Sequence, residues 1–182
     1  MFKKRDNIKE IEEGKYLEPK FDENGLIPVI TSDFKTGDIL MHEYMNEEAL
    51  KKTIETKEAY YWSRSRKKIW HKGQVSGFVQ KVKEIRIDDD QDSIWLSVDI
   101  GNGSSCHVGY RSCFYRSVPL GKISDDNKIE MNFEEKNKVF DKYLLGSSEY
   151  PLKYSLNALT TLLGVDIRPS LFGSSPIHSI IC

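Results

Sequence analysis

Four aspartates stand close together near the middle of the chain, at positions 88, 89, 90 and 92. Asp88, Asp90 and Asp92 are spaced at i, i+2 and i+4, so on a strand they share a face and in a loop they can surround a cation. Their carboxylate oxygens are the ligands that hard ions such as Mg²⁺ prefer. An EF-hand is excluded, because Ser93 stands where that loop needs glycine and Asp99 where it needs glutamate. From spacing alone, a Mg²⁺ site and a solvated acidic turn both stay open.

Two cysteines, Cys106 and Cys113, follow the aspartates, and His107 stands beside the first of them. Thiolates and imidazoles bind Zn²⁺, although a gap of six residues between cysteines matches no zinc-finger spacing. Two buried free thiols in a β core are the alternative. The third cysteine, Cys182, ends the chain and is interpreted as incidental. An odd number of cysteines does not indicate a disulfide framework.

A basic segment with interleaved aromatic residues precedes both groups. Its members are Arg64, Arg66, Lys67, Lys68 and Lys72, together with Trp62, Trp70 and His71. Guanidinium groups suit phosphates and aromatic faces suit bases, so a nucleotide site is one interpretation. An exposed hairpin with solvated charges is the other. The loop 73–77 offers backbone N–H groups for a phosphate, which by itself is a weak signal.

The elements that must position these side chains are mostly strands. Residues 26–30 and 39–41 are short β-prone runs, and Lys35-Thr36-Gly37-Asp38 between them favours a hairpin turn. A helix of about three turns is predicted to begin at the N-cap Asn46. Its buried stripe is expected to consist of Ala49, Leu50, Thr53 and Ile54. Residues 60–66 are then predicted as a strand, and residues 69–77 as a turn-rich loop.

The pattern after the loop is again that of strands. Residues 77–87 are β-prone, and residues 93–100 alternate so that Ile94, Leu96, Val98 and Ile100 share one face. A tight turn at 101–104 leads to a further strand that is expected to run through Val118. This order of strands, one helix and more strands predicts an α+β fold with a mainly antiparallel β core.

The two ends of the chain differ from this middle part. Residues 1–20 are polar and are predicted as a loose or helical lead-in without a core of its own. After Pro119, apolar residues have helical spacing, and Gly146 and Gly164 are predicted helix ends. The two stripes, which predict a helical hairpin, are Val139, Phe140, Tyr143 and Leu144, then Leu152, Leu156, Leu159 and Leu163. The tail from Asp166 is expected to be irregular.

Bulk composition excludes several classes of protein. The 182 residues carry a formal net charge of −1, which argues against nucleic-acid binding driven by bulk charge. No run approaches the roughly 18–20 apolar residues that span a bilayer. The basic N-terminus is followed by no apolar core, so it is not a secretory signal. We therefore expect a soluble cytoplasmic protein with no nucleic-acid or membrane partner.

Taken in order, these segments resemble the phosphoribosyl-AMP cyclohydrolases of histidine biosynthesis. The resemblance rests on the aspartate cluster and on Gly25-Leu26-Ile27-Pro28-Val29-Ile30, Leu40-Met41, Tyr44-Met45-Asn46, Glu48-Ala49-Leu50, Tyr61-Trp62-Ser63-Arg64-Ser65-Arg66, Trp70, Lys72-Gly73, Ser76-Gly77, Cys106-His107-Val108-Gly109 and Ser112-Cys113-Phe114-Tyr115-Arg116. It covers residues 22–118, which are predicted as a cyclohydrolase-like domain between the lead-in (1–21) and a helical C-terminal extension (119–182). The extension is shorter than the pyrophosphohydrolase domain that often follows in this family, so no second activity is expected.

The resemblance also implies cofactors and a partner. It implies an intertwined homodimer with metal sites at or near the subunit interface, Mg²⁺ on Asp88, Asp90 and Asp92, and Zn²⁺ on Cys106 and Cys113. The family's third zinc ligand is usually a cysteine between the first two aspartates, where this chain has Asp89. Asp89 itself, a water or His107 is then expected to complete the zinc shell.

The reaction implied is hydrolysis of the N1–C6 bond in the adenine ring of N1-(5-phosphoribosyl)-AMP. His107 is the candidate for proton transfer, because it adjoins a proposed zinc ligand and titrates near neutrality. The candidate substrate contacts are Trp62, Arg64, Arg66, Lys72, Ser76, Gly77 and Arg116. Gln74 departs from the Glu that the family often has after Lys-Gly. The departures at Asp89 and Gln74 leave open a paralogue that acts on another purine nucleotide. A non-catalytic nucleotide- or metal-binding protein is the second alternative.

Overall fold

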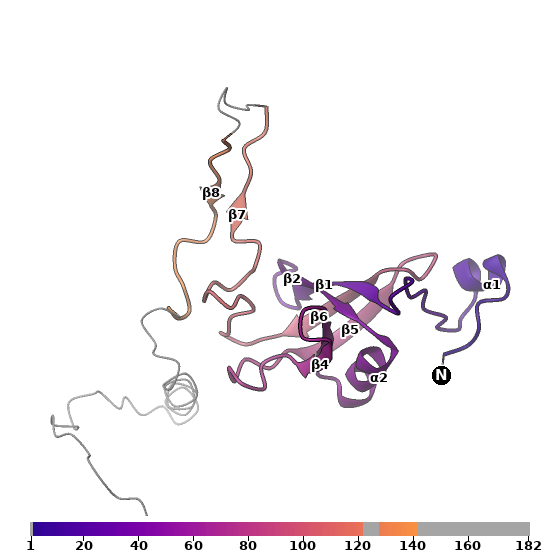
Figure 1. Ribbon diagram of the computed structural model, residues 1–182. Helices are drawn as coiled ribbons and strands as arrows, with labels where there is room; N and C mark the ends of the chain where they lie inside the picture. The colour runs from indigo at the N-terminus through magenta and orange to yellow at the C-terminus, as the bar shows by residue number, and fades with distance from the viewer. Residues whose placement is uncertain (1, 122–127, 142–182) are drawn as a thin grey trace, which may run out of the picture.

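The computed structural model describes residues 2–121 and 128–141, which form an α+β fold (Figure 1). Its elements are α1 (Ile8–Glu13), β1 (Ile27–Asp33), β2 (Ile39–Met45), α2 (Glu47–Thr56), β3 (Tyr60–Ser63), β4 (Lys68–His71), β5 (Lys81–Ile87), β6 (Ile94–Asp99), β7 (Arg116–Ser117) and β8 (Asn132–Phe133). Four strands form the central sheet in the order β2-β1-β6-β5, and the pairs β3–β4 and β7–β8 lie outside it. This arrangement confirms the predicted α+β class.

The sheet is mainly antiparallel, as the strand pattern predicts. The β1–β2 pair is a hairpin through the expected turn, and β5 and β6 are also antiparallel. In the middle, β1 and β6 run parallel, with Val29 opposite Ile94. The predicted inner face of β6 is confirmed, because Ile94, Leu96 and Val98 are all buried and pack in one core with β1 and β2.

The predicted helix is α2, and its N-terminus is capped as expected. The side-chain oxygen of Asn46 accepts a hydrogen bond of 2.9 Å from the backbone N–H of Ala49. Leu50 and Thr53 are buried as predicted, whereas Ile54 is 43% exposed and its predicted burial is wrong. Because a helix turns about 100° per residue, the buried stripe ends at Leu50 on one side, and Ile54 lies about 40° beyond it.

The predicted loop after β3 is also partly wrong, because residues 68–71 form strand β4. This strand pairs with β3 in register, with Tyr61 opposite Trp70 and Ser63 opposite Lys68. Lys67 has a φ of 48° and makes the tight connection between the two strands. The basic residues Arg64, Arg66 and Lys67 therefore lie at the tip of a hairpin.

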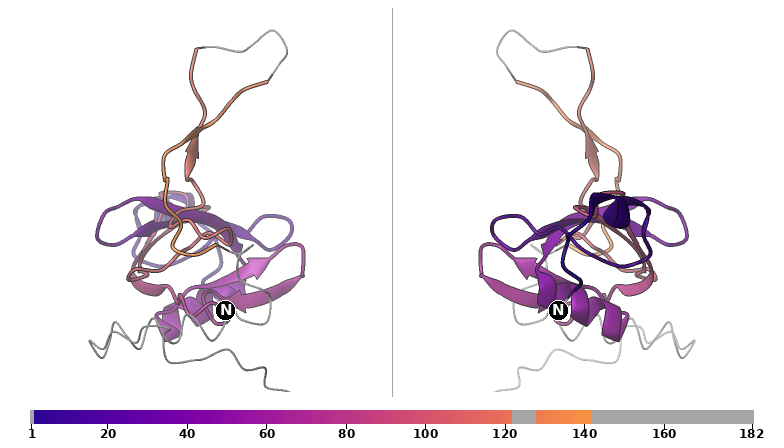
Figure 2. Two further views of the ribbon diagram at one scale, coloured as in Figure 1. Left: turned by 90° about the vertical axis from the view of Figure 1, so that its left-hand side faces the viewer. Right: turned by 90° about the vertical axis from the view of Figure 1, so that its right-hand side faces the viewer.

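The N-terminal lead-in contains the short helix α1, and its Ile11 is buried. At the other end, the strand expected through Val118 shortens to β7, which pairs with β8. The β7–β8 arm projects away from the rest of the fold in all three views (Figure 1, Figure 2). Val139 and Phe140 lie in irregular chain, and the rest of the predicted helical hairpin lies outside the described residues. No helix in the described ranges has the length and apolar character needed to cross a membrane.

Candidate functional site

The two predicted metal-binding groups lie at opposite ends of the central sheet. The acidic loop, residues 88–93, joins β5 to β6 where Ile87 faces Ile94. The chain leaves β6 at its other end, after Asp99, and then reaches Cys106. A strand of six residues is about 20 Å long at roughly 3.3 Å per residue. Figure 1 shows the acidic loop beside α1 and the segment after β6 on the far side of the sheet.

Within the acidic loop, oxygens of Asp88, Asp89 and Asp90 come within 4.8 Å of one another. One oxygen of Asp88 also accepts hydrogen bonds of 2.9 Å from the backbone N–H groups of Asp92 and Ser93. These bonds curl the loop back on itself and hold the side chain of Asp88 in place. The carboxylate of Asp92 is not one of these three, and a lysine bridges it to the carboxylate of Asp90.

Lys20 places its ammonium against two carboxylates of the acidic loop. Its ammonium nitrogen lies 3.0 Å from a carboxylate oxygen of Asp90 and 3.0 Å from one of Asp92. The hydrogen bond from Lys20 lowers the pKa of the Asp90 carboxyl, and the bonds to Asp90 and Asp92 raise the pKa of Lys20. Sequence patterns contain no signal for this contact, which joins residues 70 and 72 positions apart.

The acidic loop is attached to the N-terminal segment by Gln91. This residue has a φ of 59° and its side chain is buried. Its side-chain oxygen accepts a hydrogen bond of 2.7 Å from the backbone N–H of Glu18, and its nitrogen donates one of 2.9 Å to the carbonyl of Ile11. The backbone N–H of Lys20 in turn donates to the carbonyl of Gln91 at 2.7 Å. The lead-in is therefore docked on the acidic loop.

The thiols of Cys106 and Cys113 lie within hydrogen-bond distance of each other. Cys106 is buried and Cys113 is exposed. Their mutual hydrogen bond lowers the pKa of Cys106, and it raises the pKa of Cys113 together with burial. The backbone N–H of Cys113 donates to the carbonyl of Leu40 at 2.7 Å, which attaches this cysteine to β2.

The loop that carries Cys106 is held by the side chains of Lys72 and of the buried Gln80. Lys72 donates a hydrogen bond of 2.7 Å to the carbonyl of Ser105, and Gln80 donates one of 3.0 Å to the Ser105 hydroxyl. The side-chain oxygen of Gln80 accepts a bond of 2.8 Å from the Tyr61 hydroxyl, which is also 2.8 Å from the hydroxyl of Thr31. Because Tyr61 has one proton to donate, Thr31 donates to Tyr61.

This hydrogen-bonded chain is completely buried. Thr31, Tyr61 and Gln80 have no exposed surface, and burial raises the pKa of Tyr61 so that it stays protonated. The sequence contains one signal for Gln80, since it alternates with Phe78 and Val82 and so takes an inward position among apolar neighbours. Sequence reasoning missed both this residue and Lys20.

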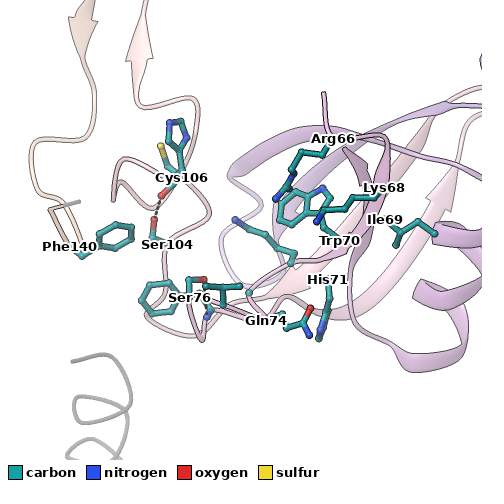
Figure 3. A pocket seen from close by; sticks show the side chains of 15 residues that line it. Arg66, Lys68, Ile69, Trp70, His71, Gln74, Ser76, Ser104, Cys106 and Phe140 are labelled. Carbon is teal, nitrogen blue, oxygen red and sulfur yellow. Dashed lines mark hydrogen bonds between the residues drawn. The ribbon is translucent and has the colours of Figure 1, made fainter. Parts of the chain in front are cut away.

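A cavity of about 490 Å³ opens beside Cys106 (Figure 3). Trp70 and Arg66 of the β3–β4 hairpin stand on one side of it, and Cys106 and Phe140 stand on the other. The complete lining is Arg66, Lys68, Ile69, Trp70, His71, Lys72, Gly73, Gln74, Val75, Ser76, Phe78, Ser104, Cys106, His107 and Phe140. No acidic side chain is among these lining residues, so the cavity favours an anionic ligand.

The cavity brings together five of the predicted site residues: Arg66, Lys72, Ser76, Cys106 and His107. His107 is exposed, while burial lowers the pKa of Lys72. Arg66 and Lys72 both lie near the face of Trp70, at 5.8 and 5.6 Å from the ring centre. Basic groups and an aromatic face thus meet next to a thiol.

The other predicted substrate contacts lie outside this lining. Arg64 packs over Tyr44 at 4.3 Å and Arg116 over Tyr115 at 4.9 Å. Gly77 is an exposed turn residue with a φ of 77°. Trp62 faces a second hollow, of about 520 Å³, whose other lining residues are Asn24, Gly25, Leu26, Asn46, Glu47, Glu48 and Lys51.

Glu43 on β2 is an acidic group near the cysteines that sequence reasoning also missed. Burial raises the pKa of its carboxyl, and the nearby charges of Arg64 and Lys72 oppose that effect. Its charge in turn contributes to the raised pKa of Cys113. Ionisable groups whose pKa is shifted by burial and by neighbouring charges are frequent in functional sites.

Comparison with known proteins gives a consistent result. The family model described as phosphoribosyl-AMP cyclohydrolase matches residues 41–115. A protein of Rhodopseudomonas palustris (strain TIE-1) named phosphoribosyl-AMP cyclohydrolase is 50% identical over 136 residues, which is 73% of this chain and 90% of the relative. Its namesake in strain BisA53 is 56% identical over 109 residues, 60% of this chain and 74% of the relative. The Nitrobacter winogradskyi protein of that name is 48% identical over 132 residues, 72% and 88% of the two chains.

Proposed function

The chain belongs to the phosphoribosyl-AMP cyclohydrolase family, and from that premise we propose how its residues divide the work. The protein is a hydrolase of histidine biosynthesis that opens the adenine ring of N1-(5-phosphoribosyl)-AMP between N1 and C6. We propose that residues 22–118 carry this activity and that residues 119–182 add no second one. The metal ligands, the substrate contacts and the homodimer belong to the same proposal.

Cys106 and Cys113 are the proposed zinc ligands. Their thiols lie close enough to share a proton, and the lowered pKa of Cys106 favours the thiolate that binds a soft cation. When bound, Zn²⁺ lowers the pKa of a coordinated water towards about 7 and so supplies the nucleophile. The buried chain from Thr31 to Ser105 and the ammonium of Lys72 hold the backbone next to Cys106, which keeps the sulfur in place.

The acidic loop is the proposed Mg²⁺ site. Its donor atoms are carboxylate oxygens, as a hard cation requires, and oxygens of Asp88 and Asp90 already lie within 4.8 Å of each other. We propose Asp88, Asp90 and Asp92 as its ligands and Asp89 as the third zinc ligand. Asp89 is proposed because it stands between the first two of these aspartates, where the family usually has its third zinc-binding cysteine.

The geometry of one chain supports a homodimer for these metal sites. Asp89 and Cys106 lie at opposite ends of the sheet, separated by roughly the length of β6. One protomer therefore cannot bring Asp89 to its own cysteines without rearranging its core. We propose that the acidic loop of a second copy approaches Cys106 and Cys113, so that each active site contains residues of both protomers.

The substrate is proposed to bind in the basic cavity. The basic lining of this cavity, beside Cys106, is the observation that carries the proposed function. Arg66, Lys72 and Ser76 are suited to a phosphate, and Trp70 offers its face to the base. His107, exposed at the same cavity, is placed to move a proton during ring opening. Gln74 also lines the cavity. Its amide can form hydrogen bonds with the substrate but cannot act as a general acid or base. Trp62, Arg64, Gly77 and Arg116 are proposed to contact the parts of the substrate that extend towards the partner.

Mixed dimers test whether the site is shared. The first protein is a double variant with Asp89→Ala and Asp90→Ala, and the second is Cys106→Ser. Each alone is expected to lose activity on phosphoribosyl-AMP, which is measured by ultraviolet absorbance. When equal amounts are unfolded and refolded together, half of the dimers are mixed and each of these has one intact site. About a quarter of the parent activity should return if ligands come from opposite protomers. No recovery, with dimers present by light scattering, would contradict the shared site.

Zinc content tests Asp89 separately. Asp89→Ala should retain less zinc per protomer than the parent protein, and Asp89→Cys should retain as much or more, because a thiolate is the softer ligand. Asp22→Ala is the control, since Asp22 is an exposed aspartate in the turn before β1. Unchanged zinc in Asp89→Ala would remove Asp89 from the zinc shell.

A further inference from the structure

Lys20 contacts the acidic loop from a part of the chain that lies outside the matched family model. That model begins at residue 41, whereas the ammonium of Lys20 lies 3.0 Å from both Asp90 and Asp92. These are two of the three aspartates proposed to hold Mg²⁺. A positive group of the protein itself therefore stands against the oxygens that a divalent ion would use.

The main chain of Lys20 is fixed against the acidic loop. The N–H of Lys20 donates to the carbonyl of Gln91, between the two aspartates that its side chain contacts. Arg5 donates to the carbonyl of Asp90 at 2.7 Å, and the buried side chain of Gln91 is bonded to the same N-terminal segment. The ordered main chain keeps the base of the Lys20 side chain beside both carboxylates, so only the rotamer freedom of that side chain is lost on pairing.

The N-terminal segment is also held from within. Glu18 is buried, with 1% of its side chain exposed, and its carboxylate lies 2.8 Å from the ammonium of Lys3. Ile11 of the same segment is also buried. These contacts do not involve the aspartates, so the segment can stay docked when the side chain of Lys20 moves away.

We propose that Lys20 is an internal counter-cation that competes with a divalent ion for Asp90 and Asp92 and thereby sets the ion affinity of the acidic loop. The proposal rests on the Mg²⁺ site of the proposed function. A carboxylate oxygen that coordinates a divalent ion has less charge to offer an ammonium, and two cations close together repel each other. Ion binding then requires the ammonium of Lys20 to move away from Asp90 and Asp92. The free energy of these two contacts is lost, so the observed free energy of ion binding is less favourable by that amount.

Manganese binding to the full chain tests the proposal without any activity assay. Mn²⁺ takes the same oxygen ligands as Mg²⁺, and its free and bound forms differ in electron paramagnetic resonance. Lys20→Gln should bind Mn²⁺ about fivefold more tightly than the parent, because two exposed ion pairs no longer have to be broken. Lys20→Arg, which keeps the charge, should stay close to the parent.

The matched control is Lys9→Gln, which removes the same charge from an exposed lysine of α1. It should change the Mn²⁺ affinity less than twofold, because a general loss of positive charge in this segment acts only through screened, longer distances. Asp92→Asn identifies the site, since it should weaken Mn²⁺ binding in both the parent and Lys20→Gln proteins.

The outcomes separate this proposal from the metal site itself. If Asp92→Asn weakens binding but Lys20→Gln and the parent bind Mn²⁺ equally, the site stands and the role of Lys20 is overturned. Equal tightening in Lys9→Gln and Lys20→Gln would overturn it as well, because charge alone would explain the effect. If Asp92→Asn leaves Mn²⁺ binding unchanged, the acidic loop is not the site and both proposals fall.

Discussion

The side-chain nitrogen of Gln80 donates a hydrogen bond of 3.0 Å to the hydroxyl of Ser105, the residue directly before Cys106. Both side chains are buried, and the same amide accepts the proton of Tyr61 through its oxygen. Gln80 thus connects the interior of the sheet to the loop of the proposed zinc ligand. Its amide can satisfy all of these partners in one orientation only, since oxygen and nitrogen have opposite roles.

Gln80→Leu should lower both stability and zinc retention. It leaves the hydroxyls of Tyr61 and Ser105 without their partner in the core, which is expected to cost about 1–3 kcal/mol of unfolding free energy. It also frees the backbone before Cys106, so zinc per protomer should fall. Urea unfolding and zinc analysis on the same preparation measure the two effects.

Tyr61→Phe is the matched comparison. It removes the hydroxyl that bonds to Thr31 and Gln80 but leaves the bond between Gln80 and Ser105. We expect a stability loss of about 1 kcal/mol and zinc retention close to the parent value. Equal loss of zinc in both variants would show that core stability, and not the contact with Ser105, controls the cysteine loop.

Lys72→Met should lower kcat/KM by at least about tenfold, equivalent to roughly 1.4 kcal/mol of transition-state stabilisation. The ammonium lines the cavity and bonds to the carbonyl of Ser105, so its loss removes a positive charge and a backbone contact together. The control is Lys35→Met, in the exposed turn between β1 and β2. An unchanged kcat/KM in Lys72→Met would remove this residue from the substrate site.

Asp33→Asn should destabilise the protein in a pH-dependent way. Burial alone would raise the pKa of Asp33, but hydrogen bonds from the backbone of Lys35 and Thr36 and the ion pair with Arg111 outweigh it and lower the pKa. A lowered folded-state pKa stabilises the protein above the unfolded value near 4, and this stabilisation is lost as pH falls through the folded pKa.

The expected difference in unfolding free energy between the parent and Asp33→Asn is about 1–2 kcal/mol at pH 7. It should shrink steadily below pH 4, where the parent carboxyl becomes protonated. Urea unfolding of both proteins across this pH range measures it. A difference that is constant with pH would mean that packing, and not the charge of Asp33, is responsible.

Asn46→Ala should cost about 1 kcal/mol, because it removes the side-chain acceptor for the N–H of Ala49 at the start of α2. The matched change is Asn7→Ala, at the N-cap of α1. That helix has six residues and is mostly exposed, so its cap should matter less. Thermal unfolding compares the two, and an equal loss of stability would contradict the expectation.

The sequence by itself determined the class of fold, the positions of most elements and the family. Alternation identified β6 and its buried face, and the Asn46 cap located α2, because these patterns act within a few residues of the chain. It failed where a partner strand decides the conformation. Residues 68–71 contain only two apolar residues and are followed by a turn, so their own pattern did not predict a strand. Pairing with β3 makes them one.

Only the tertiary structure decided which distant residues meet. Lys20 contacts Asp90 across 70 positions, Gln80 contacts Ser105 across 25, and the acidic loop and the cysteines are separated by the length of β6 although few residues lie between them. Local patterns specify backbone conformation and the face on which a side chain lies. Contacts between elements follow from how those elements pack, and no pattern within one element contains that information.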